Sequence, residues 1–178
     1  LVRFLMGVPR MTYKYEWQTL PKKLDGWSDS DHAGCKDTRK ATSCGIETLG
    51  SHILHTYSST QDVIGLSSGE AEFYALTTLV GHQIYTQNIL EDLGVKVTIT
   101  AKTDSTAGRG LAHRRGVGKA RHMDARHLWL QDWVAKGRVQ TEKVDGDENP
   151  ADVGTKPLQA GKFWYLLQKR AYGLPWGM

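Results

Sequence analysis

The sequence has no long apolar run and very little cysteine, and each absence narrows the class of protein. No hydrophobic stretch approaches the roughly 20 residues that a membrane-spanning helix needs, and no N-terminal stretch has the regions of a signal peptide. Cys35 and Cys44 form no CxxC pair, so a disulfide framework and a thiolate zinc site are both disfavoured. We therefore expect a soluble, intracellular protein with free thiols and no membrane partner.

Several enzyme fingerprints are absent as well. The sequence contains no GxSxG motif, no P-loop and no dinucleotide-binding motif. His122 and His127 are five residues apart and do not share one helical face, as zinc ligands at i and i+4 would. These absences argue against a serine hydrolase, a nucleoside triphosphatase and a zinc enzyme.

The composition favours one globular domain with a basic surface. The chain has 178 residues, 39% of them hydrophobic, and six tryptophans that can supply a core. Its formal net charge is +4, from 23 basic and 19 acidic residues. If four of the acids serve a metal site, 15 remain against the 23 basic residues. A basic surface around an acidic spot suits a polyanion that is processed with metal.

Hydrophobic periodicity and turn residues predict a mixed α/β chain. Gly50 and Ser51 divide the strings SCGIETLG and SHILHTYSS into a hairpin of two strands. Ser67 followed by Glu70 is a capping box, which starts a helix that Gly94 ends. The strand after that helix indicates a parallel crossover. Further strands are expected at 24–30, 97–103 and 138–144, and further helical segments at 1–9, 120–136, from 149 and within 165–178.

Four carboxylates fall at the edges of these elements. In chain order they are Asp29, Glu72, Asp104 and Asp152. Clustered acids repel one another unless a hard cation such as Mg²⁺ neutralises them. Asp29 would lie near the exit of its strand, on the same face as Trp27 by the period of two. The spacing along the chain means that only the fold can bring the four acids together.

Each of the other three acids has a structural explanation beside the functional one. Glu70 is explained by the capping box, whereas Glu72 lies on a face turned toward the protein, where a buried salt bridge is the alternative to a metal. Asp104 follows a strand at the edge where ligand sites form, and a turn-and-cap role is its alternative. Asp152 follows Pro150 in the first turn of a helix, where the helix dipole alone favours an acid.

Five strings in the sequence carry a family resemblance. They are WSDSDHAGCKDTRKATSCG, LSSGEAEFYAL, TDSTA, RHMDARHLWLQDWV and ENPADVGTKPL. In this order they resemble the ribonuclease H domain at the C-terminal end of copia-type retrotransposon polyproteins, over residues 24–158. Residues 1–23 are similar to the end of the preceding reverse transcriptase, and 159–178 would form a C-terminal helix and tail. The resemblance implies a five-stranded mixed sheet, with three antiparallel and two parallel strands, flanked by helices.

The resemblance also implies an activity, a cofactor and partners. The activity is hydrolysis of the RNA strand of an RNA:DNA hybrid with two Mg²⁺ ions, for which Mn²⁺ would substitute. Carried across by position, Asp29 would bridge both ions, Asp152 would help hold the ion that activates water, and Glu72 and Asp104 would hold the other. Asp31 would either hold a metal-bound water or cap its loop. The implied partners are the hybrid and the reverse transcriptase of the same polyprotein, in the cytoplasm, a virus-like particle or the nucleus.

A glycine-rich basic segment, residues 109–126, is the main candidate for phosphate contacts, with a solvated loop as the alternative. Its basic residues are Arg109, Arg114, Arg115, Lys119, Arg121 and Arg126. Arg39 and Lys40, near the first acid, form a smaller second candidate. Selection of RNA needs contacts to 2′-hydroxyl groups. The polar residues placed for this are Ser30, Ser68, Ser105 and Thr106.

Two departures from the family pattern bear on turnover and packing. Cellular and many retroviral relatives carry a histidine in a loop before the last acid, whereas residues 137–151 contain none, so we expect slower or differently assisted turnover. His32 stands where relatives often carry tryptophan, which weakens a packing contact. Two other functions remain open. One is a silent domain that binds hybrids or the polymerase, and the other is a DNA nuclease or integrase of related fold.

Overall fold

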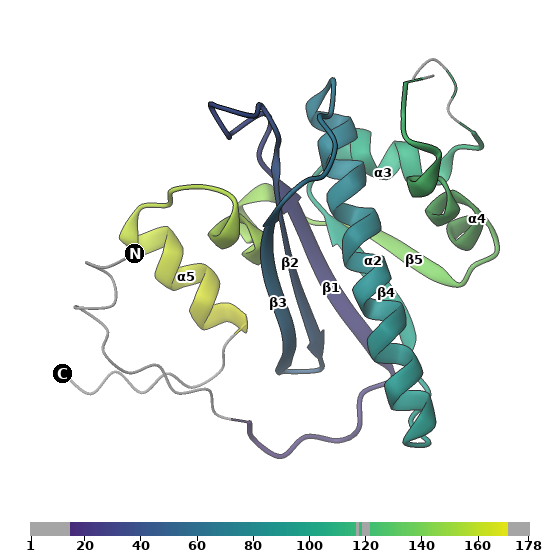
Figure 1. Cartoon of the computed structure of the whole chain (residues 1–178). Coiled ribbons are helices and arrows are strands. Elements are labelled where there is room, and N and C mark those ends of the chain that lie inside the picture. Colours follow the sequence, from purple (N-terminus) through teal and green to yellow (C-terminus); the bar gives the residue numbers. More distant parts are fainter. Residues whose placement is uncertain (1–14, 117, 119–121, 171–178) are drawn as a thin grey trace.

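The computed structural model describes residues 15–116, 118 and 122–170 (Figure 1). The N-terminal helix expected before Pro9 and the aromatic tail expected after residue 170 lie outside the described residues. In chain order the elements, with η for 3-10 helices, are β1 (Lys23–Ser30), β2 (Thr42–Leu49), β3 (His52–Thr60), α2 (Ser68–Asp92), β4 (Thr98–Thr103), α3 (Thr106–His113), η1 (Ala125–His127), α4 (Trp129–Ala135), β5 (Val139–Lys143), η2 (Gly146–Glu148), η3 (Pro150–Gly154) and α5 (Ala160–Arg170).

The five strands form one mixed sheet in the order β3-β2-β1-β4-β5. β1 pairs antiparallel with β2, and β2 with β3, so these strands form the expected meander. β4 pairs parallel with both β1 and β5. The predicted fold class is therefore confirmed. β1, the strand that carries Asp29, is the central strand of the sheet.

Helix α2 lies across the sheet, as Figure 1 shows, and closes the main core. Its Leu76 and Leu79 are fully buried in one cluster with Ile99 of β4. Gly26 of β1 permits this close approach, since a Cβ there would lie 2.7 Å from the side-chain amide of Gln83. That amide donates instead to the backbone carbonyls of β1 and β4, at 3.0 and 3.2 Å. The helix is thus fixed in register against the two strands that carry Asp29 and precede Asp104.

The other face of β1 meets the segment around η3. Trp27 is buried in a second cluster with Cys44 and Ala151. The alternation of Gly26 toward α2 and Trp27 toward η3 is the period of two that the sequence predicts. Figure 1 shows α5 on the opposite side of the sheet from α2, and α5 contacts η3.

Three elements differ from the sequence-based expectation. The glycine-rich segment from residue 109, expected as a loop, begins within helix α3, which the Ser105 hydroxyl caps at the N–H of Gly108. The helix expected over 120–136 is divided within its described part into η1 and α4, because the carboxylate of Asp124 accepts from the N–H of Arg126 and starts a new short helix there. The last helix begins at Ala160, earlier than the string that predicted it. Among the described residues, no helix is both long and apolar enough to cross a membrane.

Candidate active site

Three of the four predicted acids converge at one end of the sheet. Asp29 is near the end of β1, and Asp104 directly follows β4, the parallel neighbour in which Thr103 is aligned with Ser28. Glu72 comes from the start of α2, which packs over these strands. The oxygens that Asp29, Glu72 and Asp104 offer all lie within 4.8 Å of one another. Parallel strands bring their carboxyl ends to one edge, and here that edge carries acids.

Within this group the carboxylate of Glu72 is buried with little to neutralise it. Its Oε1 accepts one long hydrogen bond, from the N–H of Ser30 at 3.4 Å, and its Oε2 is buried without a hydrogen-bond partner. The described residues form no ion pair with it, so the buried salt bridge considered as an alternative is not observed there. Burial, together with the charges of Asp29 and Asp104, raises the pKa of Glu72 to about 8.

The two aspartates of the group share this electrostatic situation. Burial raises the pKa of Asp29 to about 6, although Thr155 and Lys156 act in the opposite direction. Burial also raises the pKa of Asp104 above its usual range. All three carboxyls hold protons more tightly than usual, chiefly because they are buried, and Glu72 also faces the charges of Asp29 and Asp104. A divalent cation would relieve this situation.

Asp152 is close to this group but is not one of the three. The side chain of Asn149 caps η3 at the N–H of Ala151 and donates to the carbonyl of Ser28 at 2.9 Å, which ties η3 to β1. Asp152 Oδ1 then accepts from Lys156 Nζ at 2.8 Å, and the same Nζ lies 3.1 Å from Asp29 Oδ1. The ammonium group of Lys156 therefore lies between the carboxylates of Asp152 and Asp29.

Thr155 and Lys156 are site residues that sequence reasoning missed. The Thr155 hydroxyl donates to Asp29 Oδ2, so both oxygens of Asp29 have donors from one dipeptide. The spacing of Asp152 and Lys156, acid followed by lysine four residues later, is a signal for their ion pair. Nothing local in the sequence indicates the second contact of Lys156, because Asp29 is 127 residues away.

Two neighbouring acids have structural roles. Asp31 Oδ1 accepts from the N–H of Thr42 at 2.6 Å, so this side chain caps its loop and is not part of the acid cluster. Ser67 accepts from the N–H of Glu70 as the capping box predicts. The Glu70 carboxylate, however, accepts from the N–H of Leu66 at 3.1 Å, one residue before the position that a capping box requires.

The residues predicted to contact nucleic acid are only partly near the acids. Ser30 directly follows Asp29, and its buried hydroxyl has no hydrogen-bond partner. Ser105 follows Asp104, but its hydroxyl caps α3 at the N–H of Gly108, 3.0 Å away. Lys119 and Arg121 lie outside the described residues.

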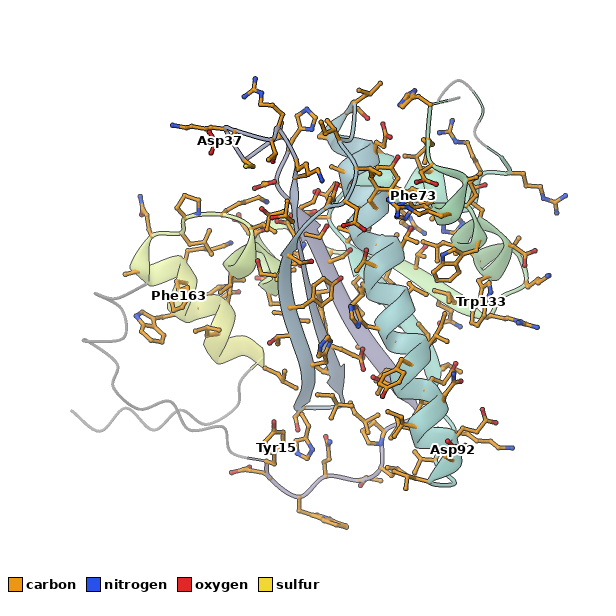
Figure 2. All side chains as sticks on the ribbon, viewed as in Figure 1. Tyr15, Asp37, Phe73, Asp92, Trp133 and Phe163 are labelled. Carbon is orange, nitrogen blue, oxygen red and sulfur yellow. The ribbon has the colours of Figure 1, made fainter. Side chains whose placement is uncertain are left out.

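The remaining basic candidates are spread over loops, short helices and the wall of a groove. Arg109 lies on α3 and its Nε donates to Thr141 Oγ1, and Arg126 lies on η1 in an ion pair with Asp124 at 2.8 Å. Arg39 and Lys40 belong to the loop after β1; Figure 2 labels Asp37 in that loop and Phe73, the residue after Glu72, at the same end of the molecule. Arg114 lines a groove of about 470 Å³ beside the start of α2, and Arg115 is exposed next to it.

Comparison with known sequences supports the resemblance inferred from the five strings. No protein-family model matches the chain. Over 142 residues it is 29% identical to the retrovirus-related Pol polyprotein from transposon TNT 1-94 of Nicotiana tabacum. The aligned segment covers 79% of this chain but only 11% of that polyprotein, so the chain spans a small part of the relative's length. The predicted similarity to retrotransposon Pol sequences is confirmed.

Comparison with solved structures identifies the fold. LC11-RNase H1, isolated from compost, matches with a TM-score of 0.50 at 16% identity, covering 74% of this chain and 91% of that one. The foamy viral protease-reverse transcriptase, solved with an RNA/DNA hybrid, matches with a TM-score of 0.50 at 12% identity, covering 88% of this chain and 22% of that one. The chain has a ribonuclease H fold.

Proposed function

We propose that this chain cuts the RNA strand of RNA:DNA hybrids, with two Mg²⁺ ions or Mn²⁺ in their place, as the ribonuclease H part of a retrotransposon Pol polyprotein. The observation that carries the proposal is the convergence of Asp29, Glu72 and Asp104 within 4.8 Å at the end of β1 and β4. The identities of the similar proteins support the proposal, since one is a transposon Pol polyprotein and another is a protease-reverse transcriptase solved with an RNA/DNA hybrid.

The residues present fit hard divalent cations. All the donors are carboxylate oxygens, which Mg²⁺ and Mn²⁺ prefer, and Glu72 Oε2 is a buried oxygen without a hydrogen-bond partner. Burial raises the pKa values of Asp29 and Glu72, so their charged forms are disfavoured in the absence of a bound cation. When bound, two such ions would lower the pKa of the attacking water and stabilise the leaving oxygen.

The chain's own residues hold this site in shape. The Ser30 N–H orients the Glu72 carboxylate toward β1. The Thr155 hydroxyl orients that of Asp29, and Asp29 lies between the Glu72–Asp104 side and the Asp152 side of the site. Gly146 lets the chain pass close to Asp104, since a Cβ there would lie 3.3 Å from Asp104 Oδ2. Together these contacts fix the carboxylates on rigid elements before substrate binds.

Hybrid binding would use the polar and basic residues around the acids. Ser105 directly follows Asp104, and its hydroxyl, which accepts from the Gly108 N–H, would donate to the 2′-hydroxyl groups that distinguish RNA. The Ser30 hydroxyl is buried, so we do not propose the same contact for Ser30. The basic segment 109–126 and the pair Arg39 and Lys40 would follow the phosphates without sequence preference. The preceding reverse transcriptase would be the protein partner.

The proposal is tested with purified chain and an end-labelled RNA:DNA hybrid in Mg²⁺. We expect Mg²⁺-dependent cutting of the RNA strand that falls by at least about 10³-fold in Asp29→Asn and in Asp104→Asn, because each removes a charged metal ligand. Duplex DNA and the Lys136→Met variant, whose change lies on the surface just after α4, are the controls. Unchanged cutting in both Asn variants would show that the site is misassigned. Tight hybrid binding without cutting in either Mg²⁺ or Mn²⁺ would instead favour the silent binding domain.

A further inference from the structure

The ammonium group of Lys156 lies between two acids of the site. Its Nζ is 3.1 Å from Asp29 Oδ1 and 2.8 Å from Asp152 Oδ1. The Asp29 side chain is fully buried and that of Asp152 is 10% exposed, whereas the Lys156 side chain is 42% exposed. A single mobile cation is therefore shared by two fixed carboxylates.

The site consequently has two unequal halves. On one side, Glu72 and Asp104 approach Asp29, and no described residue forms an ion pair with Glu72. On the other side, the same Asp29 shares the Lys156 ammonium with Asp152. Positive charge from the protein is thus concentrated in one half.

We propose that Lys156 is the resident cation of the Asp29–Asp152 half, and that a divalent ion binds between these two carboxylates only when the ammonium swings away. The inference rests on the proposed function, because it concerns the ions of that site. Metal binding would then be sequential: the first ion binds at Asp29, Glu72 and Asp104, and the second exchanges with Lys156.

Charge and space both indicate that a divalent ion would replace the Lys156 ammonium and would not bind beside it. The ammonium contacts Asp29 Oδ1 and Asp152 Oδ1, and a divalent ion held by the same two carboxylates would lie close to it. Like charges a few ångströms apart repel strongly inside a protein. Lys156 can leave because its partly exposed side chain has a long flexible stem. Asp29 would keep its orientation meanwhile, since its other oxygen accepts from Thr155.

The proposal is tested by Mn²⁺ binding to the nucleic-acid-free chain, measured by calorimetry and by electron paramagnetic resonance. We expect one ion to bind wild type more tightly than a second. In Lys156→Met, which keeps an unbranched stem one atom shorter and removes the charge, the second ion should bind at least about tenfold more tightly than in wild type. Lys156→Arg, which keeps the charge, should retain the wild-type stoichiometry and affinities.

Lys136→Met is the matched control. Lys136 also forms an i,i+4 ion pair, with Asp132 at 2.7 Å, but at the exposed C-terminal end of α4. The Lys136→Met substitution removes the same charge from the same kind of ion pair, but at a place away from the acids of the site. Equal tightening of Mn²⁺ binding in Lys136→Met and Lys156→Met would show a general effect of net charge and would overturn the proposal.

Thermal unfolding supplies a second measurement. If Lys156 were purely structural, its loss would lower the melting temperature by the same amount in EDTA and in Mn²⁺. In EDTA, Lys156→Met should melt below wild type, because Asp29 and Asp152 then face each other without a cation. Excess Mn²⁺ should close this gap, since a ligand bound more tightly stabilises the folded state more. A gap that stays the same in EDTA and in Mn²⁺ would contradict the exchange.

The two proposals fail in different ways. If wild type shows the sequential binding and Lys156→Met tightens the second ion, the role of Lys156 stands even where no hybrid is cut, and only the proposed function fails. If Mn²⁺ binding is the same in wild type and Lys156→Met, the role of Lys156 is overturned whether or not hybrids are cut.

Discussion

Glu70 and Glu72 stand two residues apart on α2, and their surroundings are opposite. Both are buried, with 3% and 9% of their surface exposed, on nearly opposite faces of the helix. Glu70 accepts hydrogen bonds from the Leu66 N–H, from the Tyr74 hydroxyl and from His122 Nε2 at 2.8 Å. Glu72 accepts one long bond, from the Ser30 N–H, and otherwise approaches other acids.

The pKa values separate the two residues in the same way. Burial acts to raise the pKa of both carboxyls. For Glu70 the hydrogen bonds from Tyr74 and His122 outweigh burial, so its pKa is lowered. For Glu72 burial is reinforced by Asp29 and Asp104, so its pKa rises to about 8. A buried acid with its donors in place supports the fold, whereas a buried acid among other acids is suited to a cation.

The largest expected effect comes from exchanging the two acids for their amides. Glu72→Gln should reduce Mg²⁺-dependent cutting of a hybrid by about 10³-fold, because a charged ligand is lost. Its metal-free stability should not fall, since a buried, repelled charge is removed. Glu70→Gln should keep cutting within about threefold and lower the free energy of unfolding by about 1–3 kcal/mol, because hydrogen bonds to a buried charge are lost.

Cutting rates and urea unfolding on both variants check this contrast. Wild type is the common reference, and circular dichroism confirms that each variant folds. If Glu70→Gln abolished cutting while Glu72→Gln did not, the two roles assigned to this helix would be reversed.

The second effect is a pH dependence of metal-free stability. The pKa of Glu72 is about 8 in the folded protein against a model value of 4.5, so the folded state binds the extra proton between these values. Its contribution to stability is therefore present at low pH and is lost as pH rises from about 4.5 to about 8. Asp29, whose pKa rises to about 6 from 3.8, acts with the same sign at lower pH.

Urea unfolding in EDTA from pH 5 to 8.5 measures this dependence. The stability of Glu72→Gln relative to wild type should grow with pH across the window, by an amount on the order of a few kcal/mol. Saturating Mg²⁺ should abolish this pH-dependent difference between the two proteins, because the ion bound to wild type favours its charged carboxylates. Parallel pH curves for the two proteins in EDTA would contradict the raised pKa of Glu72.

The sequence predicts this contrast to a large extent, because the signals for it are local. The capping-box pattern predicts a structural role for Glu70, although its carboxylate accepts from the Leu66 N–H in place of the Ser67 N–H. The helical period places Glu72 on the buried side. The strand ends place Asp29 and Asp104 at one edge once β1 and β4 are parallel, as observed. The helix start at Asn149 and Pro150 also appears where the sequence puts it.

What sequence reasoning missed depends on contacts across long separations. Lys156 reaches Asp29 across the sheet, and no periodicity encodes that contact. Asp152, which the family resemblance counts among the four site acids, lies outside the group of three and shares the Lys156 ammonium with Asp29. His122 joins Glu70 from 52 residues away, in a segment that the sequence assigns to one longer helix.

A smaller effect is expected from Tyr74→Phe, which removes one donor to Glu70. The Tyr74 hydroxyl is buried and donates to Glu70 Oε1. Its loss should lower the free energy of unfolding by about 1–2 kcal/mol and leave cutting within about twofold of wild type. Unfolding of Tyr74→Phe, Glu70→Gln and the double variant gives the coupling between the two side chains. No coupling would mean that Glu70 does not depend on this donor.

The smallest effect is expected from Ser67→Ala, which removes the cap of α2. Ser67 Oγ accepts from the Glu70 N–H at 3.2 Å, so the variant should lose about 1 kcal/mol of unfolding free energy. Cutting should stay within about twofold, because Glu72 lies in the packed part of the helix and its carboxylate is oriented by Ser30 on β1. Urea unfolding and initial cutting rates, with Ser67→Asp as a variant that retains a cap, measure both quantities. A tenfold loss of cutting in Ser67→Ala, restored by Ser67→Asp, would mean that the helix start itself positions Glu72 and that the two faces of α2 are not independent.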